Sequence, residues 1–156
     1  MAKSKEIPVT SLNDPRLPVR FWRKVSVADS GCWEWTAGQL RGGYARFRVG
    51  GRGSKSGVAH RFAYETLVGK IPDGRQLDHL CRVRHCVNPA NLEPVTPREN
   101  TLRGETPAAA NAAKTHCPAG HEYTVSNTYL DKPRGIRMCR LCGRDRMRKI
   151  RAKKGK

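Results

Sequence analysis

Hydrophobic and polar residues alternate with a period of two in two short segments of the first third of the chain. Residues 32–36 alternate large and polar groups, as does the run of residues 44–49 that follows Gly42-Gly43. On a strand, Ala45, Phe47 and Val49 face a core, whereas Tyr44, Arg46 and Arg48 face outward. The turn-forming run Gly50-Gly51-Arg52-Gly53 then predicts a hairpin whose returning strand ends near residues 58–60.

The pattern changes to a helical one in the next segment. Residues 61–68 place Phe62, Ala63 and Leu67 at helical spacing, and Gly69 and Pro72 end the run. Residues 76–80 predict another short strand, and residues 82–91 a loop with a turn at Asn88-Pro89.

Residues 96–99 predict a well-defined helix start. Thr96 is the expected N-cap, Pro97 suits the first helical position, and Glu99 completes a capping box. Asn100 therefore lies in the first turn of a short helix.

Composition restricts the class of protein. A chain of 156 residues with 37% hydrophobic residues allows one ordinary domain or two small ones. No apolar run is long enough to cross a bilayer, and the first residues do not resemble a secretory signal. We therefore expect a cytoplasmic protein whose six cysteines are not structural disulfides.

The formal net charge of +18 predicts a polyanionic partner. A membrane surface would call for a basic amphipathic helix with large apolar residues on one face. The tryptophans lie elsewhere in the chain, so nucleic acid is the better prediction.

The residues that suggest catalysis are Asp78, His79, Asn91 and Asn100. Asp78 and Asn100 offer oxygen ligands that suit Mg²⁺ or Mn²⁺. His79 points to the opposite face of the strand, where a general base for a water nucleophile belongs. Asn91 is expected to hold the loop or the imidazole in place. Taken singly, each of these residues is also compatible with a purely structural role.

Several motifs resemble the core of HNH endonucleases, and in particular the phage group related to intron homing enzymes. The resemblance covers roughly residues 20 to 104. Its motifs are Trp33-Glu34-Trp35-Thr36, Gly43-Tyr44-Ala45-Arg46-Phe47, Ala59-His60-Arg61-Phe62-Ala63-Tyr64-Glu65, Leu77-Asp78-His79-Leu80-Cys81-Arg82, Cys86-Val87-Asn88-Pro89-Ala90-Asn91-Leu92-Glu93-Pro94-Val95-Thr96 and Glu99-Asn100.

This resemblance implies a ββα-metal fold that hydrolyses DNA phosphodiesters with one divalent ion. It implies that His79 is the general base, Asp78 and Asn100 are metal ligands, and Asn91 is the orienting residue. Many relatives have His at the position of Asn91, and many HNH enzymes have His at that of Asn100. Asn88 is a rival for the orienting role but is interpreted as a turn former.

A second module is predicted by Cys117, His121, Cys139 and Cys142, which form a Cys-x3-His and Cys-x2-Cys pattern. Three thiolates and one imidazole are a common structural ligand set for Zn²⁺. The sequence therefore predicts a small zinc ribbon, with His116 as a less favoured substitute ligand. Cys32, Cys81 and Cys86 stay open between free cysteines and a second zinc site completed by His60 or His85.

Basic residues are concentrated in the last part of the chain, where residues 134–156 contain eleven Lys or Arg and one acid, Asp145. Arg140, Arg144 and Arg148 recur at helical spacing and predict contacts with the DNA backbone. In the expected nuclease domain, the residues predicted to contact DNA are Arg46, Arg48, Arg61 and Arg103. The alternatives are an ordinary solvated sheet surface and a disordered solubilising tail.

The expected architecture is α+β, in which a small antiparallel sheet and helix precede an HNH nuclease core. The expected segments are a flexible arm (1–20), a nuclease domain (21–104), a linker (105–115), a zinc ribbon (116–144) and a basic tail (145–156). We expect a monomeric, metal-dependent endonuclease for double-stranded DNA, phage-encoded and active in the bacterial cytoplasm. The alternatives are a non-catalytic zinc-ribbon DNA-binding protein and an RNA-binding protein, although no aromatic stacking platform for RNA is evident.

Overall fold

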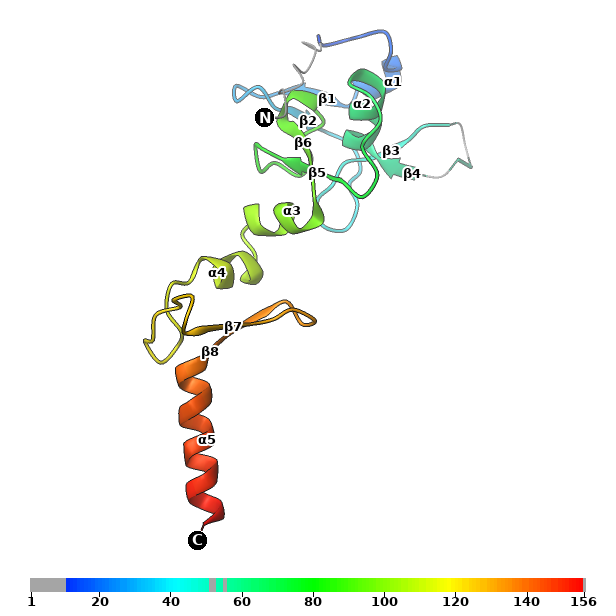
Figure 1. Cartoon of the computed structure of the whole chain (residues 1–156). Helices are drawn as coiled ribbons and strands as arrows, with labels where there is room; N and C mark the ends of the chain where they lie inside the picture. The colour runs from blue at the N-terminus through cyan, green and yellow to red at the C-terminus, as the bar shows by residue number, and fades with distance from the viewer. Residues whose placement is uncertain (1–10, 51–52, 55, 156) are drawn as a thin grey trace. The chain divides into compact units, whose positions relative to one another are not determined.

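The computed structural model describes residues 11–50, 53–54 and 56–155 (Figure 1). The chain divides into two compact units, with the boundary between Arg103 and Gly104. Both units combine antiparallel two-stranded sheets with helices, so the mixed α+β class is confirmed. No helix within the described ranges has the length and apolar character needed to span a membrane.

The first unit contains three antiparallel hairpin-like pairs and three α-helices among its described residues. Its elements, in chain order, are α1 (Val19–Trp22), β1 (Val25–Val27), β2 (Trp33–Trp35), β3 (Arg46–Arg48), β4 (Ser56–Val58), α2 (Ala59–Leu67), β5 (Gln76–His79), the 3₁₀ turn η1 (Pro89–Asn91), β6 (Leu92–Val95) and α3 (Pro97–Arg103). β1 pairs with β2, β3 with β4, and β5 with β6.

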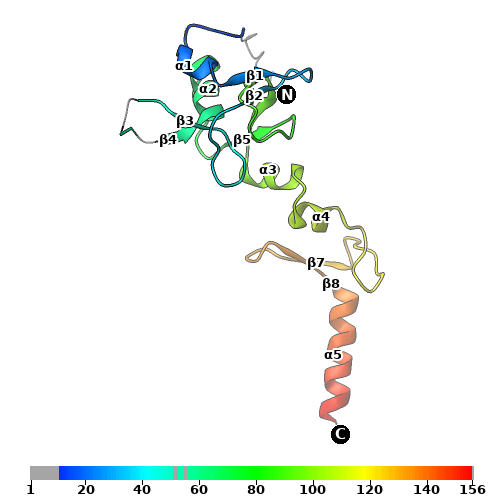
Figure 2. The same ribbon diagram turned by 180° about the vertical axis from the view of Figure 1, so that it is seen from behind.

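The β5–β6 pair contains Asp78 and His79, two of the residues expected to act in catalysis. Its register places Asp78 opposite Glu93 and His79 opposite Leu92. α3 follows β6 directly, so two antiparallel strands lead into a helix. Figure 2 shows α3 next to the part of the first unit that contains β5. The predicted capping box is present: the Thr96 hydroxyl accepts from the Glu99 backbone N–H at 3.1 Å, and the Glu99 carboxylate accepts from the Thr96 backbone N–H at 2.8 Å. This cap fixes where α3 begins.

Aromatic residues form most of the core of the first unit. Phe21 from α1 packs edge-on against Phe47 of β3, with ring centroids 5.2 Å apart, and also contacts Trp35 of β2. A second cluster joins Tyr64 of α2 to Leu77 of β5, together with Ile71 and Leu92. The β5–β6 pair is therefore anchored on α2 by apolar packing.

The predicted strand pattern around β3 is confirmed except at one end. Ala45 and Phe47 are buried, while Arg46 and Arg48 are exposed. Val49 was expected to face the core, but its side chain is 52% exposed because the strand ends at Arg48. The turn at residues 50–53 lies partly outside the described residues.

The expected arm at residues 1–20 is shorter than the sequence suggested. Residues 1–10 lie outside the described residues, but the chain is packed from about residue 14 onward. Leu17 is buried, and Asp14 accepts two side-chain hydrogen bonds from Arg16 at 2.9 and 2.7 Å. This segment is packed because Leu17 and Phe21 belong to the aromatic core. The polar residues around Leu17 give no indication that this part of the chain is buried.

The second unit contains α4 (Pro107–Ala113), the antiparallel pair β7 (Thr128–Asp131) and β8 (Ile136–Cys139), and α5 (Arg140–Lys154). The segment expected to be a linker therefore includes a helix. Thr106 caps it by accepting from the Ala109 backbone N–H at 3.0 Å, Pro107 occupies the first turn, and alanine has high helix propensity. The segment expected to be a tail is the greater part of α5, an exposed helix.

Candidate nuclease and zinc sites

Asp78 and His79 are adjacent on β5, and both side chains are buried, at 3% and 7% exposure. Successive side chains on a strand point to opposite faces, and their contacts differ accordingly. Asp78 contacts arginines near α3, whereas the ring of His79 packs against His60 of α2, with centroids 4.6 Å apart. The two residues therefore present an anionic oxygen and an imidazole on opposite sides of one strand.

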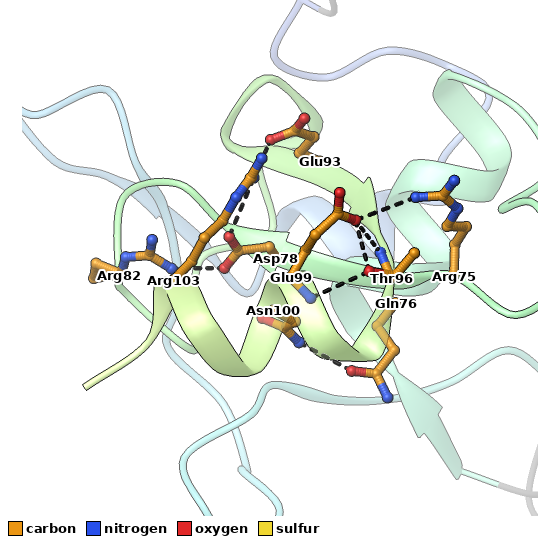
Figure 3. Close-up of polar contacts among 9 residues, drawn as sticks. All are labelled: Arg75, Gln76, Asp78, Arg82, Glu93, Thr96, Glu99, Asn100 and Arg103. Carbon is orange, nitrogen blue, oxygen red and sulfur yellow. Dashed lines mark hydrogen bonds and ion pairs between the residues drawn. The ribbon is translucent and has the colours of Figure 1, made fainter. Parts of the chain in front are cut away.

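The carboxylate of Asp78 is only partly satisfied by its neighbours (Figure 3). Its Oδ1 accepts a hydrogen bond from Arg82 Nη1 at 2.6 Å. Its Oδ2 is buried and has no hydrogen-bond partner, although Arg103 Nη1 lies at ion-pair distance, 3.6 Å. A buried oxygen without a hydrogen-bond partner is costly, and a bound cation would remove that cost.

Asn100 lies in the first turn of α3 on the side that faces β5 (Figure 3). Its Nδ2 donates to Gln76 Oε1 at 3.0 Å. That bond orients the amide and leaves Oδ1 as the end that can bind a cation. A carboxylate oxygen and an amide oxygen suit Mg²⁺ or Mn²⁺, so the residues present fit the expected divalent ion.

Arg103, expected to contact DNA, is instead bound to carboxylates. It forms an ion pair with Glu93 as well as with Asp78. Glu93 and Asp78 face each other across the β5–β6 pair, and a cation between them reduces their repulsion. Arg82, Arg103 and Glu93 were not recognised in the sequence as neighbours of Asp78; the i+4 spacing of Arg82 was the one local signal.

The imidazole of His79 is held by the main chain of the following loop. Its Nε2 lies 3.1 Å from the carbonyl oxygen of Cys86. Burial lowers the pKa of His79, opposed by the Cys86 hydrogen bond and the Asp78 charge. The ring is therefore neutral at physiological pH, which is the state a general base needs.

The sequence places His60 at the end of a strand, but in the structure it lies in the first turn of α2, beside His79. Burial, with the charges of His79 and Arg61, lowers the pKa of His60 to about 3. Its Nδ1 is buried without a hydrogen-bond partner. His60 is thus a neutral ring that packs against His79 and does not titrate near neutral pH.

Asn91 was expected to hold either the loop or the imidazole of His79 in place, and its contacts are with the loop and with two cysteines. Its carboxamide Nδ2 is 3.6 Å from both Cys32 Sγ and Cys86 Sγ. Its backbone carbonyl accepts from the Leu80 backbone N–H at 2.9 Å, so it supports the loop through the main chain. The contact to the His79 ring comes from Cys86 instead. Asn88 caps the 3₁₀ turn by accepting from the Ala90 backbone N–H, the role of a turn former.

The four expected ligands of the zinc ribbon lie together in the second unit. One ligand atom from each of Cys117, His121, Cys139 and Cys142 lies within 4.8 Å of the others. Hydrogen bonding from the Cys142 backbone N–H lowers the pKa of Cys139 to about 6, which favours the thiolate that metals bind. The set fits a tetrahedral Zn²⁺ ion in which every position is taken by protein. His116 is not part of it.

Basic residues form two exposed groups, one in each unit. In the first unit, Arg46 and Arg48 of β3 line a shallow hollow with Arg20 and Lys24. Arg20 and Lys24 were missed because the sequence places them in or next to the expected arm. Arg61 is exposed and lies 3.6 Å from Glu65.

In the second unit, a groove along α5 is lined by Arg140, Arg144, Arg146, Arg148 and Arg151. All five arginines belong to α5. Arg148 lies 3.9 Å from Asp145, while Arg140 Nε donates to the Thr128 carbonyl.

Comparison with known proteins agrees with the arrangement around β5. A family model described as HNH endonuclease matches residues 58–102, which include Asp78, His79, Asn91 and Asn100. Protein 2.8 of Escherichia phage T7 is 27% identical over 127 residues, covering 79% of this chain and 87% of that protein. An uncharacterized gene 5.3 protein of Enterobacteria phage T3 is 34% identical over 64 residues, covering 39% of this chain and 63% of that protein. No solved structure matches. Residues 58–102 are therefore an HNH endonuclease-family segment, in a chain that has relatives among phage proteins.

Proposed function

We propose that this protein is a metal-dependent endonuclease that hydrolyses phosphodiester bonds of double-stranded DNA. The observation that most strongly supports this is the placement of Asp78 and His79 on β5. Asp78 offers a buried oxygen without a hydrogen-bond partner, and His79 is a buried, neutral imidazole on the opposite face. The match of residues 58–102 to a nuclease family supports the same reaction.

His79 is the proposed general base. With its proton on Nε2, which donates to the Cys86 carbonyl, the lone pair is on Nδ1. Nδ1 then accepts a proton from a water molecule whose oxygen attacks phosphorus. The bond from phosphorus to the 3′ oxygen breaks, and that oxygen takes a proton from solvent, which leaves a 3′ hydroxyl and a 5′ phosphate.

Asp78 and Asn100 are the proposed ligands of one Mg²⁺ or Mn²⁺ ion. When bound, this ion stabilises negative charge on the phosphate and on the leaving oxygen. Arg82 and Arg103 hold the Asp78 carboxylate in position, and Gln76 orients the Asn100 amide. These contacts limit the movement of both ligands between turnovers.

DNA binding is assigned to the two basic groups. Arg46, Arg48, Arg20 and Lys24 surround a hollow in the first unit, and Arg140, Arg144 and Arg148 line the groove along α5. Contacts of this kind bind phosphates without reading sequence. Exposed Arg61 remains a proposed contact, whereas Arg103 is better explained as a counter-ion of Asp78 and Glu93. We propose a monomer acting in the cytoplasm of a bacterial host.

The second candidate is a non-catalytic DNA-binding protein, and one observation favours it. The polar groups of the site already bind one another, because Asp78 pairs with Arg82 and His79 Nε2 contacts Cys86. The two candidates differ in whether DNA is cut.

The distinguishing experiment incubates supercoiled plasmid with the full chain and Mg²⁺, Mn²⁺ or EDTA, beside His79→Ala. We expect nicked or linear product with a divalent ion, no product with EDTA, and a rate about 10²–10⁴-fold lower in the variant. Lys70→Gln serves as a surface control, because Lys70 is exposed, pairs with Asp73 and belongs to none of the proposed sites. Cleavage by His79→Ala at the wild-type rate would exclude the mechanism. Absence of cleavage with every metal, alongside normal DNA binding, would favour the non-catalytic candidate.

A further inference from the structure

Three cysteines outside the proposed catalytic site converge within the first unit. Cys32 directly precedes β2, whereas Cys81 and Cys86 lie in the loop between β5 and β6, about fifty residues later. Their sulfur atoms all lie within 4.8 Å of one another. Cys32 and Cys86 are buried and Cys81 is partly buried. This grouping comes from tertiary packing, since nothing in the local sequence links Cys32 to the other two.

The side chain of Asn91 approaches the same point. Its carboxamide lies 3.6 Å from the sulfur atoms of Cys32 and Cys86. As an NH₂ donor it makes only weak bonds to sulfur. Turning the carboxamide by 180° places Oδ1 beside these two sulfur atoms instead, where it can act as a fourth ligand atom.

The histidines that could complete the cluster have other neighbours. His85 lies 3.9 Å from the Glu34 carboxylate, and His60 packs on His79 and Tyr44. Among the described residues, Asn91 is therefore the polar side chain best placed to be the fourth member.

The chemistry of the group favours a metal over free thiols or a disulfide. Three sulfurs converge, so any single disulfide leaves one thiol unpaired in a buried place. Sulfur ligands at about 2.3 Å from a tetrahedral Zn²⁺ ion lie about 3.8 Å apart. That separation is compatible with the three sulfur atoms, which all lie within 4.8 Å of one another. Thiolates are soft ligands that bind Zn²⁺ in preference to hard cations such as Mg²⁺ and Mn²⁺, whereas the oxygen atoms of Asp78 and Asn100 suit the hard cations.

We propose that Cys32, Cys81 and Cys86 bind a structural zinc ion, with the Asn91 carboxamide oxygen as the fourth ligand. This site is separate from the zinc ribbon and from the Mg²⁺ or Mn²⁺ site. It does not rest on the proposed nuclease function.

The site would join the loop after β5 to β2. Main-chain bonds already run between these segments: the Trp35 N–H donates to the His85 carbonyl, and the Val87 N–H donates to the Trp33 carbonyl. A zinc ion bound by Cys86 Sγ would fix the same residue whose carbonyl contacts His79 Nε2. Cys86 is thus a positioning residue for the proposed base.

The test measures zinc per chain by elemental analysis of the purified full-length protein. We expect two zinc ions in the wild type, one in Cys81→Ser, one in Cys142→Ser and none in the double variant. Cys142→Ser is the matched control, because it makes the same substitution at a partly buried ligand of the ribbon. One zinc in the wild type that persists in Cys81→Ser would overturn the proposal. One zinc that is lost in Cys81→Ser but kept in Cys142→Ser would support it.

A second measurement covers the case in which Cys81→Ser does not fold. Co²⁺ is added to metal-free Cys142→Ser, which keeps the three cysteines of the first unit. We expect the intense visible bands of tetrahedral cobalt and a thiolate-to-cobalt charge-transfer band; their absence would overturn the proposal. Asn91→His, which supplies a stronger zinc ligand, is expected to slow zinc loss to a chelator. An unchanged rate would remove Asn91 from the ligand set.

Discussion

His79 Nε2 lies 3.1 Å from the carbonyl oxygen of Cys86, so a cysteine of the proposed zinc cluster orients the proposed catalytic base. The two residues are seven positions apart, at opposite ends of the Leu80–His85 segment. Arg82 in this segment adopts a left-handed backbone conformation with φ of 60°, which is uncommon outside glycine. The same residue donates to Asp78 at 2.6 Å. One short loop therefore positions both His79 and Asp78.

Asp78→Asn is expected to abolish both cleavage and stabilisation by Mg²⁺. The variant keeps the shape of the side chain but removes the negative charge that a hard cation requires. A ligand that binds only the folded state stabilises it by RT ln(1 + [L]/Kd), or about 2.7 kcal/mol at one hundred times Kd. The measurement is the melting temperature of the protein, with its zinc sites filled, in the presence and absence of added Mg²⁺. Glu93→Gln is the matched control, because Glu93 faces Asp78 and also binds Arg103. Equal Mg²⁺ shifts in wild type and Asp78→Asn would contradict the ligand assignment.

The cleavage rate is expected to fall at acid pH, with a midpoint below the usual pKa of a histidine. Burial lowers the pKa of His79, so the neutral base persists at pH values where an exposed imidazole, with a pKa of about 6.5, is protonated. The cleavage rate should hold as pH falls through about 6.5 and decline only at lower pH. Single-turnover rates between pH 5 and 8 provide the measurement, with DNA binding followed at each pH to separate loss of affinity. An acid midpoint at or above 6.5 would contradict the assignment of His79.

Cys139→Ser is expected to remove one zinc ion and unfold the ribbon. The second unit has few buried apolar side chains among its described residues, so metal binding must supply much of its folding free energy. Structural zinc in such modules contributes about 10–16 kcal/mol in apparent terms at pH 7. Limited proteolysis should cut the variant within residues 104–156 while residues 14–103 stay protected. Ser126→Ala, on the exposed surface of the same unit, should retain the zinc and the protection. A Cys139→Ser protein with full zinc content would exclude the ribbon.

Arg144→Gln is expected to weaken DNA binding equally for all sequences and to reduce its salt dependence. Removing one ion pair with a DNA phosphate changes the slope of log K against log salt concentration by about 0.9. Affinity measured from about 50 to 200 mM salt gives that slope directly. Lys70→Gln is the control for the change in total charge, because Lys70 is paired with Asp73 at 3.1 Å and belongs to neither basic group. Equal slopes for wild type and Arg144→Gln would remove α5 from the DNA-binding surface.

Local features of the fold were predictable because they depend on residues only two to four positions apart. Thr96 and Glu99 fix the start of α3 by bonding to each other's backbone, and the alternation around Phe47 gives the buried face of β3. Each ligand pair of the expected zinc ribbon, Cys117 with His121 and Cys139 with Cys142, is likewise close together in the sequence. Val49 and the helix in the expected linker were misjudged because the ends of elements depend on caps and neighbours as well as on pattern.

By itself, the sequence determined the charge that predicts a nucleic-acid partner, the ligand pairs of the ribbon, and the adjacency of Asp78 and His79 on one strand. Tertiary structure decided which groups these residues meet. Asn91 lies beside Cys32, from which it is separated by 59 positions, and Arg103 forms ion pairs with both Asp78 and Glu93. Such contacts arise from the packing of the aromatic core and from strand register, which bring distant segments together. Local periodicity does not indicate which distant residues will be in contact. The ligands of a metal and the partners of a buried charge can therefore be identified only in the folded chain.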